Sequence, residues 1–386
     1  MNRTPRVALM RNRIYPGGVF HVMLQMIRSL NQKGVVPDLV TLKSKVSPEL
    51  AAQKYNMEVQ FRVREILADL RIPYEWHILL FNKISRHELR KYDIVINHNN
   101  TSFLYERPGR QKLISYVHFP RKARGLSRAQ SIHRPEGPRK KWYHIRHDPF
   151  MLASHAYRFD NHVDKEEIVL ANSTFTRQTL LNHYAMEAAD VDVLYPPVEI
   201  PDGLPSSPKD EMMVVSLGRF APEKRQMEQL EIARQLPNLQ FRIMGFLSDQ
   251  NYFEKCRAYK ERHGLDHVEL LPDLPFDQLN TLLDRAGLFL HSIRNEPFGI
   301  TTVEAISHGC LPVVPDSGGQ VEIVPDQDLR YSDTAEAAAI IKRVIDVPPG
   351  AKKERRDRLF KRVQEFDTDN FRQQFDELLN KVTGAS

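Results

Sequence analysis

Short apolar runs alternate with amphipathic stretches along the whole chain. In the first half, β-branched and aromatic runs predict strands at 6–10, 39–42, 93–97, 113–117 and 168–171. In the second half, similar runs predict strands at 212–217, 239–244, 268–271, 288–292 and 311–314. Parallel strands are buried on both faces and need crossover connections, which are usually helices. The pattern therefore predicts an α/β fold with two doubly wound, Rossmann-like domains facing across a cleft.

The helical and linker patterns set the domain limits. Residues 19–30 carry apolar positions at the three-and-four spacing of a helix that stops before Gly34, and 352–382 is helical with a break near 366–370. Residues 200–210, IPDGLPSSPKD, have the composition of a linker. We therefore expect a first Rossmann-like domain over 1–200, a linker over 201–210, a second Rossmann-like domain over 211–365 and a helix over 366–386 that can cross back to the first domain.

Composition narrows the class of protein. Of 386 residues, 41% are hydrophobic and 27% are charged, the balance of a folded soluble chain. No apolar stretch approaches the roughly 18 residues that span a bilayer, and the polar start has no signal core, so we expect a cytoplasmic protein. Cys256 and Cys310 lie far apart without a metal-ligand or redox spacing. We expect both to be structural thiols.

The basic charge of the chain is concentrated in one segment. The net charge is +6, and residues 121–146 hold nine Lys or Arg against Glu136 alone, together with Trp142 and Tyr143. Such a segment suits an anionic membrane surface, on the inner face of the membrane, although a solvated loop explains it equally well. A nucleic-acid-binding protein is the non-enzyme alternative, but it leaves the motifs below unexplained, so no nucleic-acid partner is expected.

The most informative run is NEPFGITTVE at 295–304, which follows the predicted strand at 288–292. Glu296 falls on the loop that leaves the carboxyl end of this strand. A helix starting at Thr301 would present free backbone N–H groups near Gly299 and Ile300, an arrangement that attracts phosphate. A capping box formed by Thr301 and Glu304 is the alternative explanation, and it needs no ligand.

A second motif leaves a strand of the same domain. The predicted strand at 212–217 runs into GRFAPEK at 218–224, which places Arg219 and Lys224 at its carboxyl end. Arginine offers a planar fork for phosphate oxygens and lysine a compact charge, so the pair could hold a diphosphate. Ligands of doubly wound folds bind at this edge of the sheet, which favours that function over a solvated turn.

Together with the small-residue turn Asp316-Ser317-Gly318-Gly319, these motifs resemble the GT-B-fold retaining glycosyltransferases of family 4. The resemblance implies that Glu296 contacts the donor sugar and Glu304 the nucleotide ribose. It also implies that the donor diphosphate is bound by side chains and by backbone N–H groups, at Arg219, Lys224, Phe298, Gly299 and Ile300. The motifs YVHFP (116–120), NSTFT (172–176) and LYPPV (194–198) are similar to those of lipid-linked-oligosaccharide mannosyltransferases.

The resemblance also implies that the domain at 1–200 binds the acceptor and the domain at 211–365 binds the nucleotide sugar. In the first domain it rests on fewer residues. Gly17 and Gly18 match the glycine-rich loop after the first strand of the family, although a helix cap would explain them equally well. His118 resembles the acceptor-side histidine near the reacting sugar.

The resemblance implies a retaining hexosyltransferase of polysaccharide biosynthesis that uses a nucleotide-sugar donor, with mannose from GDP-mannose as the first expectation. The acceptor would be a hydroxyl of a glycan or of a lipid-linked acceptor, and UDP- or ADP-sugars are the alternative donors. No cofactor or metal is expected, since protein cations would neutralise the leaving diphosphate. The acidic triplets at 190–192 and 367–369 are interpreted as turn and capping residues.

Overall fold

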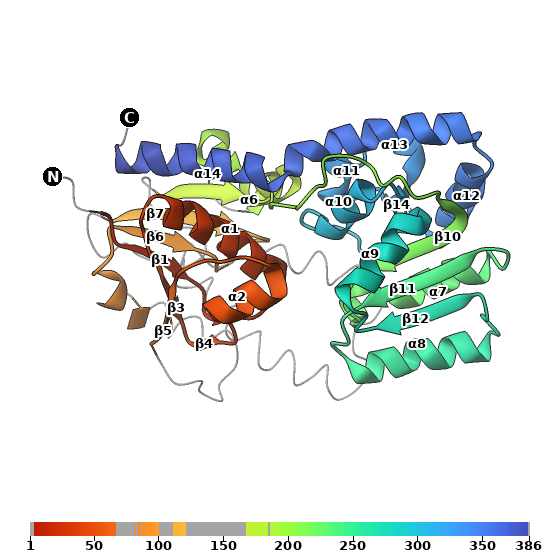
Figure 1. Cartoon of the computed structure of the whole chain (residues 1–386), viewed down its shortest axis with the longest axis horizontal. Helices are drawn as coiled ribbons and strands as arrows, with labels where there is room; N and C mark the ends of the chain where they lie inside the picture. Colours follow the sequence, from red (N-terminus) through yellow and green to blue (C-terminus); the bar gives the residue numbers. More distant parts are fainter. Residues whose placement is uncertain are drawn as a thin grey trace. The chain divides into compact units, whose positions relative to one another are not determined.

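The computed structural model describes residues 4–66, 81, 84–85, 87–99, 111–120, 167–183 and 186–384. The chain forms two compact units (Figure 1). Unit 1 comprises Met1–Pro197 with Thr368–Ser386, and unit 2 comprises Val198–Asp367.

Unit 1 is built on a seven-stranded parallel sheet. Its strands are β1 (Val7–Met10), β3 (Asp38–Thr41), β5 (Arg62–Glu65), β6 (Ile94–Asn97), β7 (Lys112–Val117), β8 (Ile168–Ala171) and β9 (Val191–Val193). The order is β5-β3-β1-β6-β7-β8-β9, so the chain winds outward in both directions from the β1/β6 pair. A separate ribbon pairs β2 (Arg13–Ile14) with β4 (Lys43–Ser44).

Both faces of the central strand β1 are buried. Val7 and Leu9 of β1 point into one apolar core, whereas Ala8 and Met10 point into another, as the two-residue period of a strand requires. The first core includes α1 (Gly18–Gln32) and α14 (Thr368–Thr383), which lie side by side in Figure 1. The other helices described in unit 1 are α2 (Pro48–Tyr55), α6 (Thr174–His183) and the short η2 (Ala188–Asp190).

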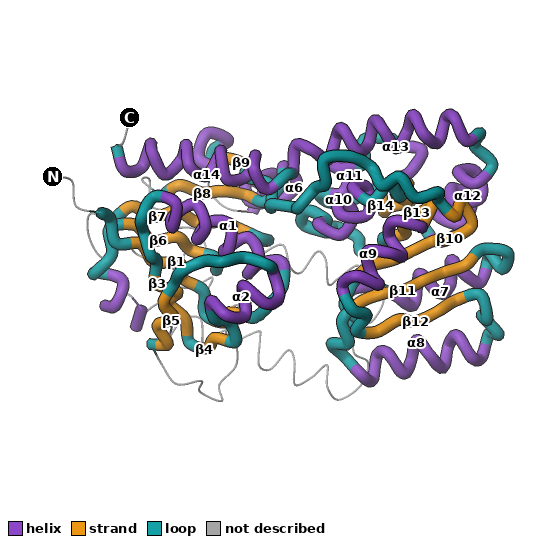
Figure 2. The backbone as a smooth tube through the Cα atoms, viewed as in Figure 1, coloured by secondary structure: helices purple, strands orange, loops and turns teal. Residues whose placement is uncertain are grey.

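Unit 2 repeats this plan with a six-stranded parallel sheet. Its strands are β10 (Asp210–Leu217), β11 (Gln240–Gly245), β12 (Val268–Pro272), β13 (Ala286–Leu290), β14 (Leu311–Pro315) and β15 (Arg330–Tyr331), in the order β12-β11-β10-β13-β14-β15. Figure 2 shows these strands between helices. Two doubly wound α/β units are thus confirmed.

The helices of unit 2 complete its layers. Leu283 of α9 (Phe276–Arg285) and Ala305 of α10 (Ile300–Ser307) share a core with Met213 of β10 and Phe289 of β13. The remaining helices and turns are η3 (Pro222–Lys224), α7 (Gln226–Arg234), α8 (Gln250–Arg262), α11 (Gln320–Ile323), η4 (Gln327–Leu329), α12 (Thr334–Ile345), α13 (Pro349–Val363) and η5 (Gln364–Phe366).

Several elements differ from the sequence prediction. The strand predicted at 288–292 ends at Leu290, so His291 and Ser292 lie beyond it. Strand β5 was missed because all four of its residues are exposed and it carries no apolar run. Asp190 accepts a hydrogen bond from the Glu187 N–H at 2.6 Å, which confirms its predicted capping role.

Two further observations bear on the predicted class of protein. Cys256 and Cys310 are buried free thiols, as expected. Among the helices of the described residues, none is both long and apolar enough to cross a membrane.

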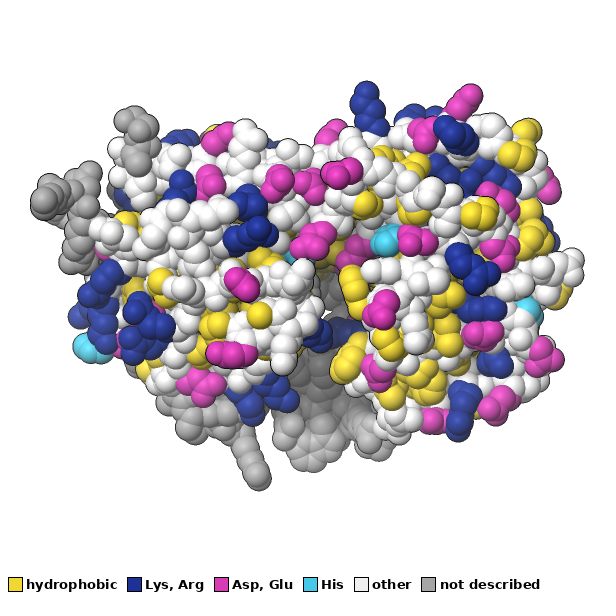
Figure 3. All heavy atoms as spheres, in the orientation of Figure 1, with side chains coloured by type: hydrophobic (Ala, Val, Ile, Leu, Met, Phe, Trp, Pro, Cys, Tyr) yellow, Lys and Arg dark blue, Asp and Glu magenta, His cyan; other side chains and the backbone are white. Residues whose placement is uncertain are grey.

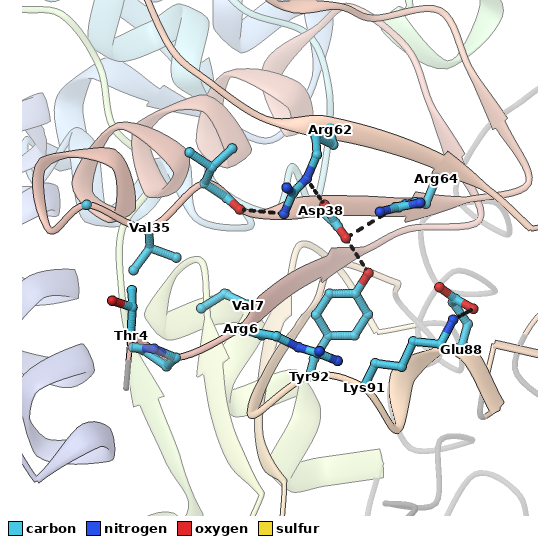
Figure 4. A pocket seen from close by; sticks show the side chains of 13 residues that line it. Thr4, Arg6, Val7, Val35, Asp38, Arg62, Arg64, Glu88, Lys91 and Tyr92 are labelled. Atoms are coloured by element: carbon cyan, nitrogen blue, oxygen red, sulfur yellow. Dashed lines mark hydrogen bonds and ion pairs between the residues drawn. The ribbon is translucent and has the colours of Figure 1, made fainter. Parts of the chain in front are cut away.

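A cavity of about 440 Å³ opens at the amino ends of the unit 1 strands (Figure 4). Asp38 lies at its centre and accepts hydrogen bonds from Tyr92 at 2.5 Å and from Arg62 at 2.6 Å. Burial raises the pKa of Asp38, but these hydrogen bonds and the Arg62 and Arg64 charges lower it on balance. Arg62 and Arg64 thus offset the charge of Asp38, and the cavity lies at the amino edge of the unit 1 sheet, whereas ligands of doubly wound folds bind at the carboxyl edge.

Candidate active site

The candidate site of unit 2 lies where its sheet changes winding direction. Strands β10 and β13 are neighbours, and the sheet continues through β11 on one side and through β14 on the other. Loops at the carboxyl ends of two such strands diverge and leave a crevice, which is the usual ligand site of doubly wound folds. Lys224 comes from the loop after β10 and Glu296 from the loop after β13.

The structure brings Lys224 and Glu296 together. The Lys224 Nζ atom lies 3.5 Å from Glu296 Oε2, and the two side chains are 28% and 20% exposed. Burial raises the pKa of the Glu296 carboxyl, but the charges of Lys224 and other neighbours lower it on balance. Glu296 is therefore held as a carboxylate, a hydrogen-bond acceptor for ligand hydroxyls, and Lys224 as a partly buried cation.

Arg219 takes a different position from the one the sequence implies. Its guanidinium pairs with Glu223 at 2.5 Å, and both side chains are more than half exposed. Exposed pairs of this kind are worth about 0–1 kcal/mol, so the pair can exchange for a ligand phosphate at little cost. The Arg219 charge still contributes to the lowered pKa of Glu296.

His291 is a site residue that the sequence prediction missed. Its Nε2 lies 3.9 Å from Glu296 Oε2 and has no hydrogen-bond partner among the residues that the structure describes. Burial lowers the pKa of this imidazole to about 4, so the ring is neutral at physiological pH. The sequence prediction counted His291 as part of the strand at 288–292 and assigned it no role. A polar residue at the carboxyl end of an apolar strand is nevertheless a sign of a possible site residue.

Helix α10 begins at Ile300, with Gly299 as its N-cap. Gly299 has a φ of 118°, and a Cβ there would lie 3.2 Å from Gln320 Cγ. The first hydrogen bond into the helix runs from Thr302 N–H to the Gly299 carbonyl at 2.9 Å. The N–H groups of Gly299 and Ile300 therefore precede the helical ladder and can receive an anion.

The capping-box alternative for Glu304 is wrong. The N-cap is Gly299 rather than Thr301, and it makes no side-chain cap hydrogen bond. Glu304 lies a full turn inside the helix, where its side chain leans back toward the amino end. Burial raises the pKa of its carboxyl to about 7, and the side chain makes no hydrogen bond or ion pair with another described residue.

The turn at 316–319 supports the Glu296 loop through close backbone packing. Gly319 N–H donates to the Glu296 carbonyl at 2.8 Å. A Cβ at Gly318 would lie 2.6 Å from the Glu296 carbonyl oxygen, and one at Gly319 would lie 2.4 Å from that of Pro297. Only glycine fits at these two positions. On the far side of the loop, buried Phe298 packs edge-on against Phe366, with ring centroids 5.1 Å apart.

The remaining predicted site residues lie in unit 1. Gly17 is the N-cap of α1 and its N–H donates to the Tyr55 hydroxyl at 2.7 Å, while Gly18 is the first helical residue. His118 follows β7, and its Nε2 lies 3.3 Å from Nδ1 of His98. Burial lowers the pKa of both imidazoles, that of His98 to about 3, so both rings are neutral at physiological pH.

The basic segment 121–146, including Trp142 and Tyr143, lies outside the described residues. Within the described part of the chain, no group of three or more His, Cys, Asp or Glu is placed to hold a metal ion. On the face of unit 2 seen in Figure 3, basic and acidic side chains are interspersed rather than gathered by sign.

Two family models match this chain, one for each half. The model described as Glycosyltransferase Family 4 matches residues 16–200, and the model described as Glycosyl transferases group 1 matches residues 204–364. The second match contains Arg219, Lys224, Glu296 and Glu304.

Curated relatives and a solved structure agree with this assignment. The chain is 29% identical over 207 residues to the GDP-Man:Man(3)GlcNAc(2)-PP-Dol alpha-1,2-mannosyltransferase of Dictyostelium discoideum, covering 47% of this chain and 39% of the relative. It is 28% identical over 171 residues to the human enzyme of that name, covering 40% and 35%. The chain thus spans less than half the length of these relatives.

Among solved structures, sucrose-phosphate synthase from Thermosynechococcus elongatus superposes with a TM-score of 0.75 at 17% identity, covering 99% of this chain and 100% of that one. At this identity the likeness concerns the fold alone. With both halves matched and the two doubly wound units in place, the chain belongs to the GT-B-fold glycosyltransferases that join a family 4 domain to a group 1 domain.

Proposed function

We propose that this protein transfers a hexose, mannose from GDP-mannose as the first candidate, to a hydroxyl of a glycan or lipid-linked acceptor with retention of anomeric configuration. The observation that carries the proposal is the Lys224–Glu296 pair at 3.5 Å, beside the free N–H groups that open α10. A nucleotide sugar presents hydroxyls to bind the carboxylate and a diphosphate to bind the cation and the helix end.

The activities for which the curated relatives are named support the choice of donor and acceptor. Both relatives described above are named as mannosyltransferases that use GDP-Man and act on a dolichol-diphosphate-linked glycan. On this basis we propose GDP-mannose as the donor of this protein. For the acceptor we propose only a hydroxyl of a glycan or of a lipid-linked acceptor.

Each donor-side residue has a role in this proposal. Lys224 and, after release from Glu223, Arg219 bind the diphosphate together with the backbone N–H groups of Gly299 and Ile300. Glu296 accepts hydrogen bonds from hydroxyls of the donor sugar. Glu304 accepts hydrogen bonds from the ribose hydroxyls, which would give its half-buried carboxyl the partners that the described residues do not supply.

The proposed reaction is a front-face displacement without a covalent enzyme intermediate. The bond between the anomeric carbon and the diphosphate oxygen breaks, and the acceptor oxygen bonds to the same face of that carbon. The acceptor proton passes to the leaving phosphate oxygen. The positive groups around that oxygen stabilise its developing charge, an effect commonly worth several kcal/mol, so no metal ion is required.

The location of the reaction follows from the proposed acceptor. A lipid-linked acceptor would place the protein at a membrane surface, and contact through the basic segment 121–146 on the cytoplasmic side stays a prediction. Sedimentation with anionic vesicles at low salt, compared with neutral vesicles, would test it.

The donor assignment is tested by calorimetric titration with GDP-mannose, UDP-glucose and ADP-glucose. GDP-mannose is expected to bind most tightly, and Lys224→Ala to weaken its binding about 10-fold or more. Transfer to octyl α-mannopyranoside is then followed by NMR, where an α-linked product indicates retention. Binding of none of the three donors, or formation of a β-linked product, would contradict the proposal.

A further inference from the structure

Unit 1 has its own point where the winding direction of the sheet changes, and three asparagines lie there. Strands β1 and β6 are neighbours, and the sheet continues through β3 on one side and β7 on the other. Asn12 follows β1, Asn97 is the last residue of β6, and Asn99 lies two residues further. Their exposed fractions are 2%, 1% and 5%. These amides therefore lie at the sheet edge where doubly wound folds bind ligands.

Hydrogen bonds fix the orientation of two of these amides. The Oδ1 atom of Asn97 accepts from the Asn99 N–H at 3.0 Å, and Oδ1 of Asn99 accepts from the Asn12 N–H at 3.0 Å. A backbone N–H can donate only to the oxygen of a carboxamide, so neither amide can be flipped. The NH2 group of each must point away from these bonds.

These NH2 groups have no acceptor among the described residues. In that part of the chain, the Nδ2 atoms of Asn12, Asn97 and Asn99 are all buried without a hydrogen-bond partner, and so is Nε2 of the adjacent His98. Buried polar groups in folded proteins are nearly always paired, and clustered exceptions mark sites where a ligand or an ordered water completes the set. Three unpaired amide donors at one sheet edge call for a ligand rich in acceptor oxygens.

The charge of the site indicates whether it binds phosphate oxygens or neutral hydroxyl oxygens of a ligand. The amides are uncharged, and the neighbouring cation Arg11 donates to the carbonyls of Arg13 and His98. A phosphate would favour cationic donors, whereas neutral hydroxyl oxygens are well served by carboxamide NH2 groups. A hydroxyl bound here would lie in a buried site away from water. Hydrogen bonds are stronger in such a low-dielectric environment than in water.

We propose that Asn12, Asn97 and Asn99 bind hydroxyl oxygens of the acceptor glycan through their unpaired NH2 groups. This inference rests on the proposed transferase function and names residues for its acceptor. The donor groups of unit 2 are charged and suit a nucleoside diphosphate, while this edge of unit 1 offers neutral donors that suit a sugar.

The direct test is NMR of protein labelled with 15N at asparagine side chains, titrated with octyl α-mannopyranoside in the absence of donor. The NH2 resonances of Asn97 and Asn99, assigned from Asn97→Asp and Asn99→Asp, should move, and those of Asn31 should not. Asn31 is a matched control because its NH2 group already donates to Val35 and Gln60 carbonyls at 3.0 and 2.9 Å. No movement at Asn97 and Asn99 up to the solubility limit of the probe would overturn the inference.

The kinetic test uses the same variants. Aspartate keeps the Oδ1 acceptor but removes the NH2 donor, so Asn97→Asp and Asn99→Asp should raise KM for octyl mannopyranoside by about fivefold or more. Hydrolysis of GDP-mannose without acceptor should stay within about twofold of wild type. Asn31→Asp should lower stability without changing KM for the acceptor.

Failure of the inference differs from failure of the proposed function. If wild-type protein transfers mannose but the variants keep its KM for the acceptor, internal waters satisfy the amides and the inference is overturned. If wild-type protein neither binds nor hydrolyses GDP-mannose, the proposed donor is wrong, and the NMR titration still decides whether these amides bind a sugar.

Discussion

Glu304 offers a sharp test of the site, because its ionised carboxylate is predicted to lower the stability of the free protein and proposed to favour nucleotide binding. Burial raises the pKa of its carboxyl from 4.5 to about 7, and the side chain has no hydrogen-bond or ion-pair partner among the described residues. An unfolded glutamate titrates near 4.5, so between these pH values the folded protein holds a proton that the unfolded chain has lost.

The free energy of unfolding should therefore fall as pH rises from 4.5 through about 7. At about 1.4 kcal/mol per pKa unit, the stability lost from this group is about 3 kcal/mol at pH 8. Glu304→Gln removes the charge but keeps a buried polar amide, which costs about 1 kcal/mol. We expect the variant to be about 2 kcal/mol more stable than wild type at pH 8 and no more stable below pH 4.5.

The assay is thermal unfolding of both proteins across this pH range, with nucleotide affinity measured in parallel. A stabilisation of about 2 kcal/mol corresponds to a Tm increase of roughly 4–8 °C at pH 8 for a unit of this size. If Glu304 binds the ribose, the same substitution should weaken GDP binding by about 10- to 100-fold, since the charge-assisted hydrogen bonds are lost.

Two results would refute this reasoning. A Tm difference that is the same at pH 4.5 and pH 8 would mean that the carboxyl does not titrate near 7. A gain in stability with unchanged GDP affinity would leave the pKa argument intact but remove Glu304 from the nucleotide site. Glu322→Gln, on the short helix α11 of the same unit, is the control for the loss of a glutamate charge elsewhere in unit 2.

Three further predictions concern the other parts of the site. Lys224→Ala should lower kcat by about 100-fold through loss of leaving-group stabilisation, and wild-type turnover in a folded variant would exclude that role. Gly319→Ala should lower activity and Tm because the new Cβ would lie 2.4 Å from the Pro297 carbonyl oxygen, whereas Gly350→Ala, in open space, should do neither; equal effects would contradict the packing argument. Treatment with EDTA should leave turnover unchanged, and a loss restored by Mg²⁺ would show that the protein cations do not suffice.

Much of the architecture was predictable because buried parallel strands carry a local signal. The runs at 168–171 and 212–217 are strongly apolar, and their strands lie at or within a few residues of the predicted bounds. Strand β5 carries no such signal, since it pairs with β3 while its four side chains stay exposed. The order of the strands in each sheet is set by tertiary packing and leaves no trace in local periodicity.

The sequence by itself determined the family, the two apolar sheets and the motifs that hold Arg219, Lys224, Glu296 and Glu304. These are properties of residue type and spacing. Only the tertiary structure brought Lys224 to Glu296, placed buried His291 beside them and left Glu304 inside a helix rather than at its cap. It alone joined Asn12 to Asn97 and Asn99, because hydrogen bonding and burial depend on residues that are distant in sequence and adjacent only once the sheets have formed.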